Sequence, residues 1–247
     1  MIDTPVLVVF LAALLTAVAT GLGALPLLAV KHLSARWLAL ANAAAAGLML
    51  AACYSLIVEG FAFDAQRTLA GIVAGLIFIV AAGRWLHRHD HVSVAEVSGA
   101  DAKRILLIVG IMTLHSAAEG VGVGVAYGGG RTLGDFITAA IALHNVPEGL
   151  AISLVMVPRG ATVVSAAGWS IFSSLPQPLL AVPAFVFVLV FQPWLPVGLG
   201  LAAGAMFWMV FAELIPEANA EAEPETVGIV VTLSFALMLG VQTLLEA

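Results

Sequence analysis

Residues 114–120 read Leu-His-Ser-Ala-Ala-Glu-Gly, and residues 143–149 read Leu-His-Asn-Val-Pro-Glu-Gly. Each stretch lies inside a long apolar segment and places a histidine four residues before a glutamate. In a helix that spacing puts both side chains on one face, one turn apart. Leu, His, Glu and Gly recur at an offset of 29 residues, and the two helices would run in opposite directions. The pattern therefore predicts an internal inverted repeat whose polar faces meet near the middle of both helices.

The composition excludes a soluble protein. Of the 247 residues, 62% are hydrophobic and 10% are charged, and the mean hydropathy is +1.11. A soluble domain is about 45–50% apolar and about 25% charged, and a chain of this size cannot bury so large an apolar excess. We therefore exclude a soluble globular enzyme and a disordered chain. The net charge of −6 argues against a nucleic-acid partner, and the single cysteine, Cys53, excludes a disulfide framework.

Eight apolar runs are long enough to cross a bilayer, which takes about 20 residues. Because the runs are continuous rather than alternating, they predict helices and not a barrel of strands. We expect an all-α, polytopic membrane protein with one domain over residues 1–247, embedded in a lipid bilayer. The expected spans are residues 5–30, 37–58, 69–87, 104–127, 133–157, 161–190, 195–216 and 226–246.

Basic residues predict the orientation of these spans, because cytoplasmic loops are enriched in lysine and arginine. Of the nine basic residues, only Arg67 and Arg131 fall on one side of the expected topology. The other side is therefore cytoplasmic, and both termini face outward. The longest polar loop, residues 88–103, carries histidines and lies on the cytoplasmic side. The basic residues of that side are Lys31, Arg36, Arg84, Arg88, Lys103, Arg104 and Arg159.

Four ionisable residues lie near mid-depth of the fourth and fifth spans: His115, Glu119, His144 and Glu148. An ionisable group inside a bilayer costs roughly 2.5–3.5 kcal/mol on insertion scales, so each is a functional candidate. A single such residue often makes only a helix–helix hydrogen bond, but two matched pairs favour a common site. Lysine and arginine are absent from the interiors of these spans, so the two carboxylates need another cation. Two carboxylates and two imidazoles suit one divalent ion of zinc or a first-row neighbour.

Prolines interrupt the helices close to these residues. Pro147 lacks a backbone donor and frees a carbonyl one turn earlier. Residues 176–178 read Pro-Gln-Pro and would free the carbonyls of Phe172 and Ser174. Broken helices at mid-depth are typical of transporters, where freed backbone groups line a polar cavity. Gln177, the amide between two prolines, could therefore face the site.

Three further polar residues remain open to two interpretations. Ser116 and Asn145 could contact a metal or make interhelical hydrogen bonds. Glu213, near the cytoplasmic end of the seventh span, could be solvated or could relay metal.

An intramembrane zinc-dependent hydrolase is the alternative function, because it would use the same ligands to activate a water. It would also need a separate general base and a substrate groove. A zinc protease helix shows His-Glu-x-x-His, whereas this chain shows His-x-x-x-Glu twice. The matched pairs therefore favour transport, and we expect no enzyme.

These motifs resemble those of a known family. Residues 144–151, His-Asn-Val-Pro-Glu-Gly-Leu-Ala, look like the signature helix of the ZIP (Zrt/Irt-like protein) metal transporters. Residues 115–120 match the partner motif of the fourth helix, and residues 213–218, Glu-Leu-Ile-Pro-Glu-Ala, are similar to a segment of the seventh. The resemblance is closest to the short bacterial branch, which implies a bacterial inner membrane.

The resemblance implies a function and a set of ligands. The function is uptake of a divalent transition metal, most simply Zn²⁺, into the cytoplasm by alternating access; Cd²⁺, Fe²⁺ and Mn²⁺ accept the same donors. The main transport site would be His115, Glu119, His144 and Glu148, and the neighbouring position would be lined by Ser116, Asn145 and Gln177. The family commonly has asparagine in place of Ser116 and a carboxylate in place of Gln177. Both departures weaken the neighbouring position, so we expect one metal site rather than two. Small-residue faces would permit a homodimer.

Overall fold

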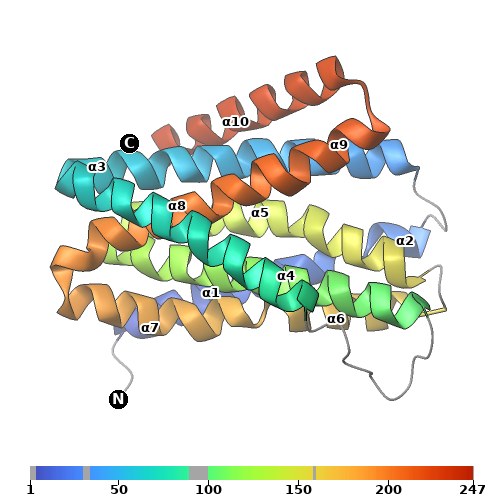
Figure 1. The fold of residues 1–247 in the computed structure, drawn as a ribbon, viewed down its shortest axis with the longest axis horizontal. Helices are drawn as coiled ribbons and strands as arrows, with labels where there is room; N and C mark the ends of the chain where they lie inside the picture. Colours follow the sequence, from blue (N-terminus) through green and yellow to red (C-terminus); the bar gives the residue numbers. More distant parts are fainter. Residues whose placement is uncertain (1–3, 30–33, 89–99, 158–159, 247) are drawn as a thin grey trace.

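The computed structural model describes residues 4–29, 34–88, 100–157 and 160–246. Every regular element in these ranges is helical, which confirms the all-α prediction for this part of the chain (Figure 1). A short 3₁₀ turn, η2 (Gln192–Trp194), and a π-helical segment, η3 (Val210–Leu214), flank α8. The α-helices are α1 (Thr4–Leu22), α2 (Pro26–Ala29), α3 (Ala35–Arg88), α4 (Ala100–Gly129), α5 (Arg131–Met156), α6 (Val163–Ser174), α7 (Pro176–Val190), α8 (Leu195–Met209), α9 (Ile215–Glu221) and α10 (Pro224–Glu246).

Six segments of the described chain are long and apolar enough to cross a membrane. The segment Ala35–Arg84 covers two of the expected spans, and the expected span 104–127 falls on α4. The count of eight spans and the inverted repeat remain predictions. The polar loop is predicted over residues 88–103, of which 89–99 lie outside the described residues. The six segments are Pro5–Ala29, Ala35–Arg84, Arg131–Met156, Val163–Val190, Gln192–Glu221 and Pro224–Leu245.

The long helix α3 reverses direction at Asp64, whose backbone is extended (φ −163°, ψ 106°) (Figure 1). The Asp64 carboxylate accepts a hydrogen bond from the Arg67 N–H at 3.0 Å, as an N-cap does at the start of a new helix. The Thr68 hydroxyl donates to the Asp64 carbonyl at 2.8 Å, and Arg67 Nη1 donates to the Pro193 carbonyl at 3.0 Å. The bend divides α3 into two arms. The first two bonds stabilise the start of the second arm, and the bond to Pro193 connects the bend to η2.

The helices form two groups. In the first group α4 packs on α7 and α5, and α1 packs on α5, α6 and α7. In the second group both α8 and α10 pack on α3. Helix α3 also contacts α5, and α4 contacts α8, so the two groups share an interface. The two motif helices, α4 and α5, lie side by side within the first group (Figure 1).

A glycine follows each motif glutamate and lets another helix approach closely. A Cβ on Gly120 would collide with the backbone of Gln177 at the start of α7. A Cβ on Gly149 would collide with the carbonyl of Thr20 on α1. In a membrane such small-residue contacts bring helix backbones together without a hydrophobic driving force. Each glutamate is therefore carried to the point where its helix crosses a neighbour.

The break between α6 and α7 lies at Leu175, one residue before Pro176. We predicted that the prolines would free the Phe172 carbonyl, and this prediction is wrong. The Leu175 N–H donates to that carbonyl at 3.2 Å, because the last turn of α6 tightens before the break. Pro147 lies inside α5, which continues through it.

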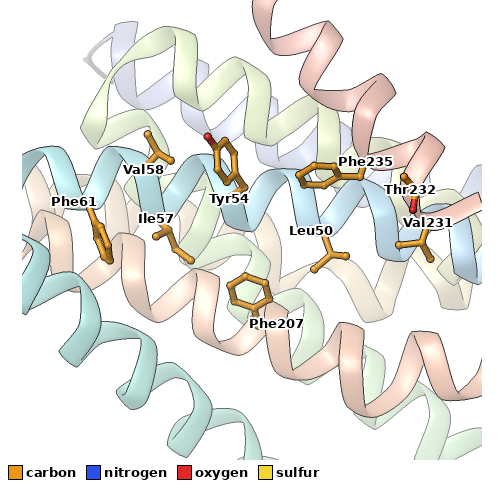
Figure 2. Close-up of a pocket in the computed structure, with 9 residues that line it drawn as sticks. All are labelled: Leu50, Tyr54, Ile57, Val58, Phe61, Phe207, Val231, Thr232 and Phe235. Atoms are coloured by element: carbon orange, nitrogen blue, oxygen red, sulfur yellow. The ribbon is translucent and has the colours of Figure 1, made fainter. Parts of the chain in front are cut away.

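An apolar groove opens between α3, α8 and α10, on the second group of helices (Figure 2). Tyr54 of α3 and Phe235 of α10 meet edge to face across it, with ring centroids 6.4 Å apart. Phe207 of α8 also lines the groove and lies below Leu50 and Tyr54 in the view of Figure 2. Among the nine residues drawn there, none is acidic and none is a histidine, so the groove is separate from the ionisable residues of α4 and α5.

Replacing Gly149 by alanine should destabilise the protein, because the added methyl group meets a backbone carbonyl that cannot swing aside. Overpacking of this kind costs about 1–3 kcal/mol. The matched control is Gly168→Ala in α6, where a Cβ meets nothing within 4 Å and the change should be neutral or slightly stabilising. Thermal unfolding of both variants in detergent checks this. Equal melting temperatures would contradict the tight crossing of α1 and α5.

Candidate metal centre

Three side chains from α4 and α5 form a buried cluster. Suitable ligand atoms of Glu119, His144 and Glu148 all lie within 4.8 Å of one another. The side chains are enclosed, with exposed fractions of 0% for Glu119, 1% for His144 and 8% for Glu148. His144 and Glu148 are one turn apart on α5, and Glu119 reaches across from α4. One nitrogen and two carboxylates at this spacing can bind a divalent cation.

The tautomer of His144 follows from its hydrogen bonds. Its Nδ1 lies 3.2 Å from the Ala140 carbonyl, which can only accept, so Nδ1 carries the hydrogen. In the neutral ring Nε2 then presents a lone pair, and it lies 2.7 Å from Glu119 Oε1. Two acceptors at this distance need a cation between or beside them, either a proton or a metal ion. A histidine that binds metal through one nitrogen usually donates the other N–H in this way.

Two oxygen atoms on α5 add to the donor set. Asn145 Oδ1 and Glu148 Oε2 are buried and make no hydrogen bond within the described part of the chain. Leaving a buried acceptor unsatisfied costs about 1–3 kcal/mol, more for a charged group. The two residues are three positions apart and therefore lie on one face of α5. Both oxygens are available to a cation bound by the cluster.

His115 lies against a different partner. Its Nε2 is 2.8 Å from Oε2 of Glu213, which belongs to η3 at the end of α8. The prediction grouped His115 with the other three residues, whereas the structure pairs it with Glu213 one turn before Glu119. Glu213 was open to two interpretations, and its side chain is 26% exposed while touching a buried histidine. A π-helical turn such as η3 is often found at functional sites.

Comparison with known proteins identifies the family of this chain. The model of the ZIP zinc transporter family matches residues 85–245. Zinc transporter ZIPB of Bordetella bronchiseptica is 34% identical over 247 aligned positions, covering 92% of this chain and 78% of the relative. The chain belongs to the ZIP zinc transporter family. With its apolar helices, it is an integral membrane protein.

Two further relatives differ in how much of their length the ZIP chain covers. Zinc transporter GufA of Myxococcus xanthus is 31% identical over 228 positions, covering 84% of this chain and 87% of the relative. A protein of Arabidopsis thaliana described as a candidate zinc transporter is 46% identical over 234 positions. That match covers 94% of this chain but only 38% of the plant protein, so the chain spans well under half of its length.

The remaining predicted site residues of this ZIP protein are hydrogen-bonded to one another or to neighbouring helices. Gln177 accepts a hydrogen bond from Asn145 Nδ2 at 3.2 Å and donates one to Glu119 Oε2 at 2.5 Å. Ser116 instead turns toward α6, where its hydroxyl lies 3.4 Å from Ser174 Oγ. The structure therefore brings Asn145 and Gln177 to the cluster and directs Ser116 away from it.

Two threonines of α1 were missed in the sequence analysis. The Thr16 carbonyl accepts from Asn145 Nδ2 at 2.8 Å, and the Thr16 hydroxyl lies 2.6 Å from Gln177 Oε1. The Thr20 hydroxyl lies 2.8 Å from Ser174 Oγ, next to Ser116. The signal was present in the sequence: these are the polar residues of an otherwise apolar segment, four positions apart and so on one face.

Replacing His144 by glutamine should weaken Zn²⁺ binding strongly, because the ring nitrogen that faces the carboxylates is lost. Loss of an outer partner of a metal ligand typically costs about 10–100-fold in affinity, and loss of the ligand itself should cost at least as much. Competition against a chelating dye measures the change. The control is Ser153→Ala on the same helix, whose hydroxyl donates to the Gly149 carbonyl. Equal Zn²⁺ affinity in both variants would remove His144 from the centre.

Proposed function

We propose that this ZIP protein carries Zn²⁺ across the membrane into the cytoplasm through the centre formed by Glu119, His144 and Glu148. The observation that carries the proposal is the buried contact between His144 Nε2 and Glu119 Oε1, which demands a cation. The choice of zinc follows from the nitrogen and oxygen donors and from the names of the relatives. Cd²⁺, Fe²⁺ and Mn²⁺ are weaker candidates that accept the same donors.

The proposed topology has eight spans in one domain, with both termini outside the cytoplasm in a bacterial inner membrane. The bend at Asp64 supports it, because it divides α3 into two arms that run in opposite directions. The distribution of basic residues supports the orientation. The glycines Gly200 and Gly204 of α8 are covered by α3 of the same chain, so these small-residue faces are used internally. Other faces remain open to a homodimer.

For the mechanism we propose alternating access. The first group of helices, α1 and α4 to α7, would move against the group built on α3, α8 and α10. His115 and Glu213 form a contact between the two groups, since one belongs to α4 and the other to η3. In the proposed orientation both lie on the cytoplasmic side of Glu119. His115 would thus be the fourth ligand of the centre and would share the departing ion with Glu213.

Asn145, Gln177 and Ser116 line the neighbourhood of the ion in this proposal. Asn145 Oδ1 adds a neutral oxygen, Gln177 contacts Glu119, and Ser116 supports the packing of α4 on α6.

The alternative function, an intramembrane zinc-dependent hydrolase, has less support than transport. The family to which the chain belongs consists of transporters rather than enzymes, and the matched motifs on α4 and α5 suit an ion path.

Glu148→Ala should abolish Zn²⁺ uptake while leaving insertion in the membrane intact. Removing one carboxylate leaves part of the charge of a divalent ion uncompensated in a medium of low dielectric. The measurement is uptake into proteoliposomes loaded with a zinc-sensitive dye, with Glu225→Ala as control, because Glu225 is an exposed glutamate in the first turn of α10.

Full uptake by Glu148→Ala would show that the ion takes another route. Absence of uptake by the unmodified protein, together with zinc-dependent peptide cleavage, would favour the hydrolase.

A further inference from the structure

The orientation of the Gln177 amide follows from a backbone carbonyl on α1. The Thr16 carbonyl can only accept, so the Asn145 atom 2.8 Å from it is the nitrogen, Nδ2. The same nitrogen lies 3.2 Å from Gln177, whose facing atom is therefore its oxygen, Oε1. The other end of that amide, Nε2, then points an N–H at Glu119 Oε2. The backbone of α1 thus determines which end of Gln177 faces the carboxylate.

Neighbouring groups keep Gln177 in this position. Its side chain is fully buried, and its oxygen also lies 2.6 Å from the Thr16 hydroxyl. Its backbone is the surface on which Gly120 of α4 packs, one residue after Glu119. The donor and the carboxylate are therefore placed by the same helix crossing, and a rotation of either side chain would leave buried polar atoms without partners.

The hydrogen bond from the Gln177 amide engages one of the two carboxylate oxygens of Glu119. Oε1 faces His144, and Oε2 accepts the N–H of Gln177. A carboxylate that bridges two metal ions needs one oxygen for each ion. An amide N–H satisfies the second oxygen without adding any positive charge. With Oε2 engaged by a neutral donor, Oε1 is the Glu119 oxygen that faces His144 and the cluster.

We propose that the Gln177 amide takes the place of a second cation beside Glu119, and so limits this centre to one metal ion per chain. The inference rests on the proposed function, because it treats Glu119 as a metal ligand. Gln177 is then a positioning residue that acts through Glu119, and not a ligand. The charge balance agrees: Glu119 and Glu148 compensate one divalent ion, whereas two ions would leave two buried positive charges unpaired.

The test is the number of Zn²⁺ ions bound per chain, measured by equilibrium dialysis of purified protein against ZnCl₂. The three histidines at the start of the polar segment, His87, His89 and His91, are replaced by serine in every protein compared, so that they cannot add to the count. Unmodified Gln177 should give about one ion. Gln177→Glu removes the donor and adds one charge with almost no change in volume, so the count should rise toward two. Gln242→Glu on α10, beside Ser55, is the matched control and should leave the count unchanged.

A second variant covers the case in which Gln177→Glu does not fold. Asn145→Asp replaces the donor that faces Gln177 Oε1 by an acceptor and adds one charge beside the cluster, so that only the Thr16 hydroxyl still holds the amide in its orientation. This variant should also bind more than one ion.

Each outcome decides the inference. Two ions in the protein with Gln177 intact, or one ion in both folded variants, would overturn the role of Gln177 while leaving transport at the centre intact. Failure of the protein with Gln177 intact to bind any Zn²⁺ would overturn the proposed function and this inference together. If neither variant folds, a count of two ions in the protein with Gln177 intact still overturns the inference, and a count of one is the result that the inference requires.

Discussion

The hydrogen bond between the His144 ring and the Ala140 carbonyl determines the chemistry of the whole centre. Because it places the hydrogen on Nδ1, the other ring nitrogen meets the Glu119 carboxylate with a lone pair. The contact is favourable only when a cation is present. Asn145 Oδ1 and Glu148 Oε2 accept no hydrogen bond from the described residues, so a cation bound nearby would also stabilise these two oxygens. A proton and a divalent metal ion would therefore compete for one place.

The close helix crossings carry these side chains to one another. Glu119 and Glu148 each precede a glycine, and each glycine packs on a backbone that belongs to another helix. The carbonyl and hydroxyl of Thr16 then orient two amides, which in turn present an N–H to Glu119. Polar contacts of Thr16, Asn145 and Gln177 thus join α1, α5 and α7 to the centre. A change in α1 can alter the site without contacting the ion.

Much of the centre could be predicted from residue spacing. A histidine and a glutamate four positions apart share a helix face wherever that helix lies, and this holds for His144 and Glu148. The same reasoning failed to anticipate the partner of His115, because Glu213 approaches from the far end of the chain and through a π-helical turn. It also left out Thr16: its polar side chain is visible in the apolar segment, but its partners Asn145 and Gln177 are far away in the sequence.

The sequence by itself determined the helical fold, the apolar segments and the pair of motifs, because these depend on composition and on periodicity along a single helix. The tertiary structure decided which oxygen of Glu119 faces His144, which end of the Gln177 amide faces Glu119, and that Ser116 points away. Those orientations depend on donors and acceptors that lie far apart in the chain, such as the Thr16 carbonyl and Asn145, which are 129 positions apart. A side chain with two different ends, an amide or an imidazole, takes its direction from the groups it meets, and only the packed helices bring those groups together.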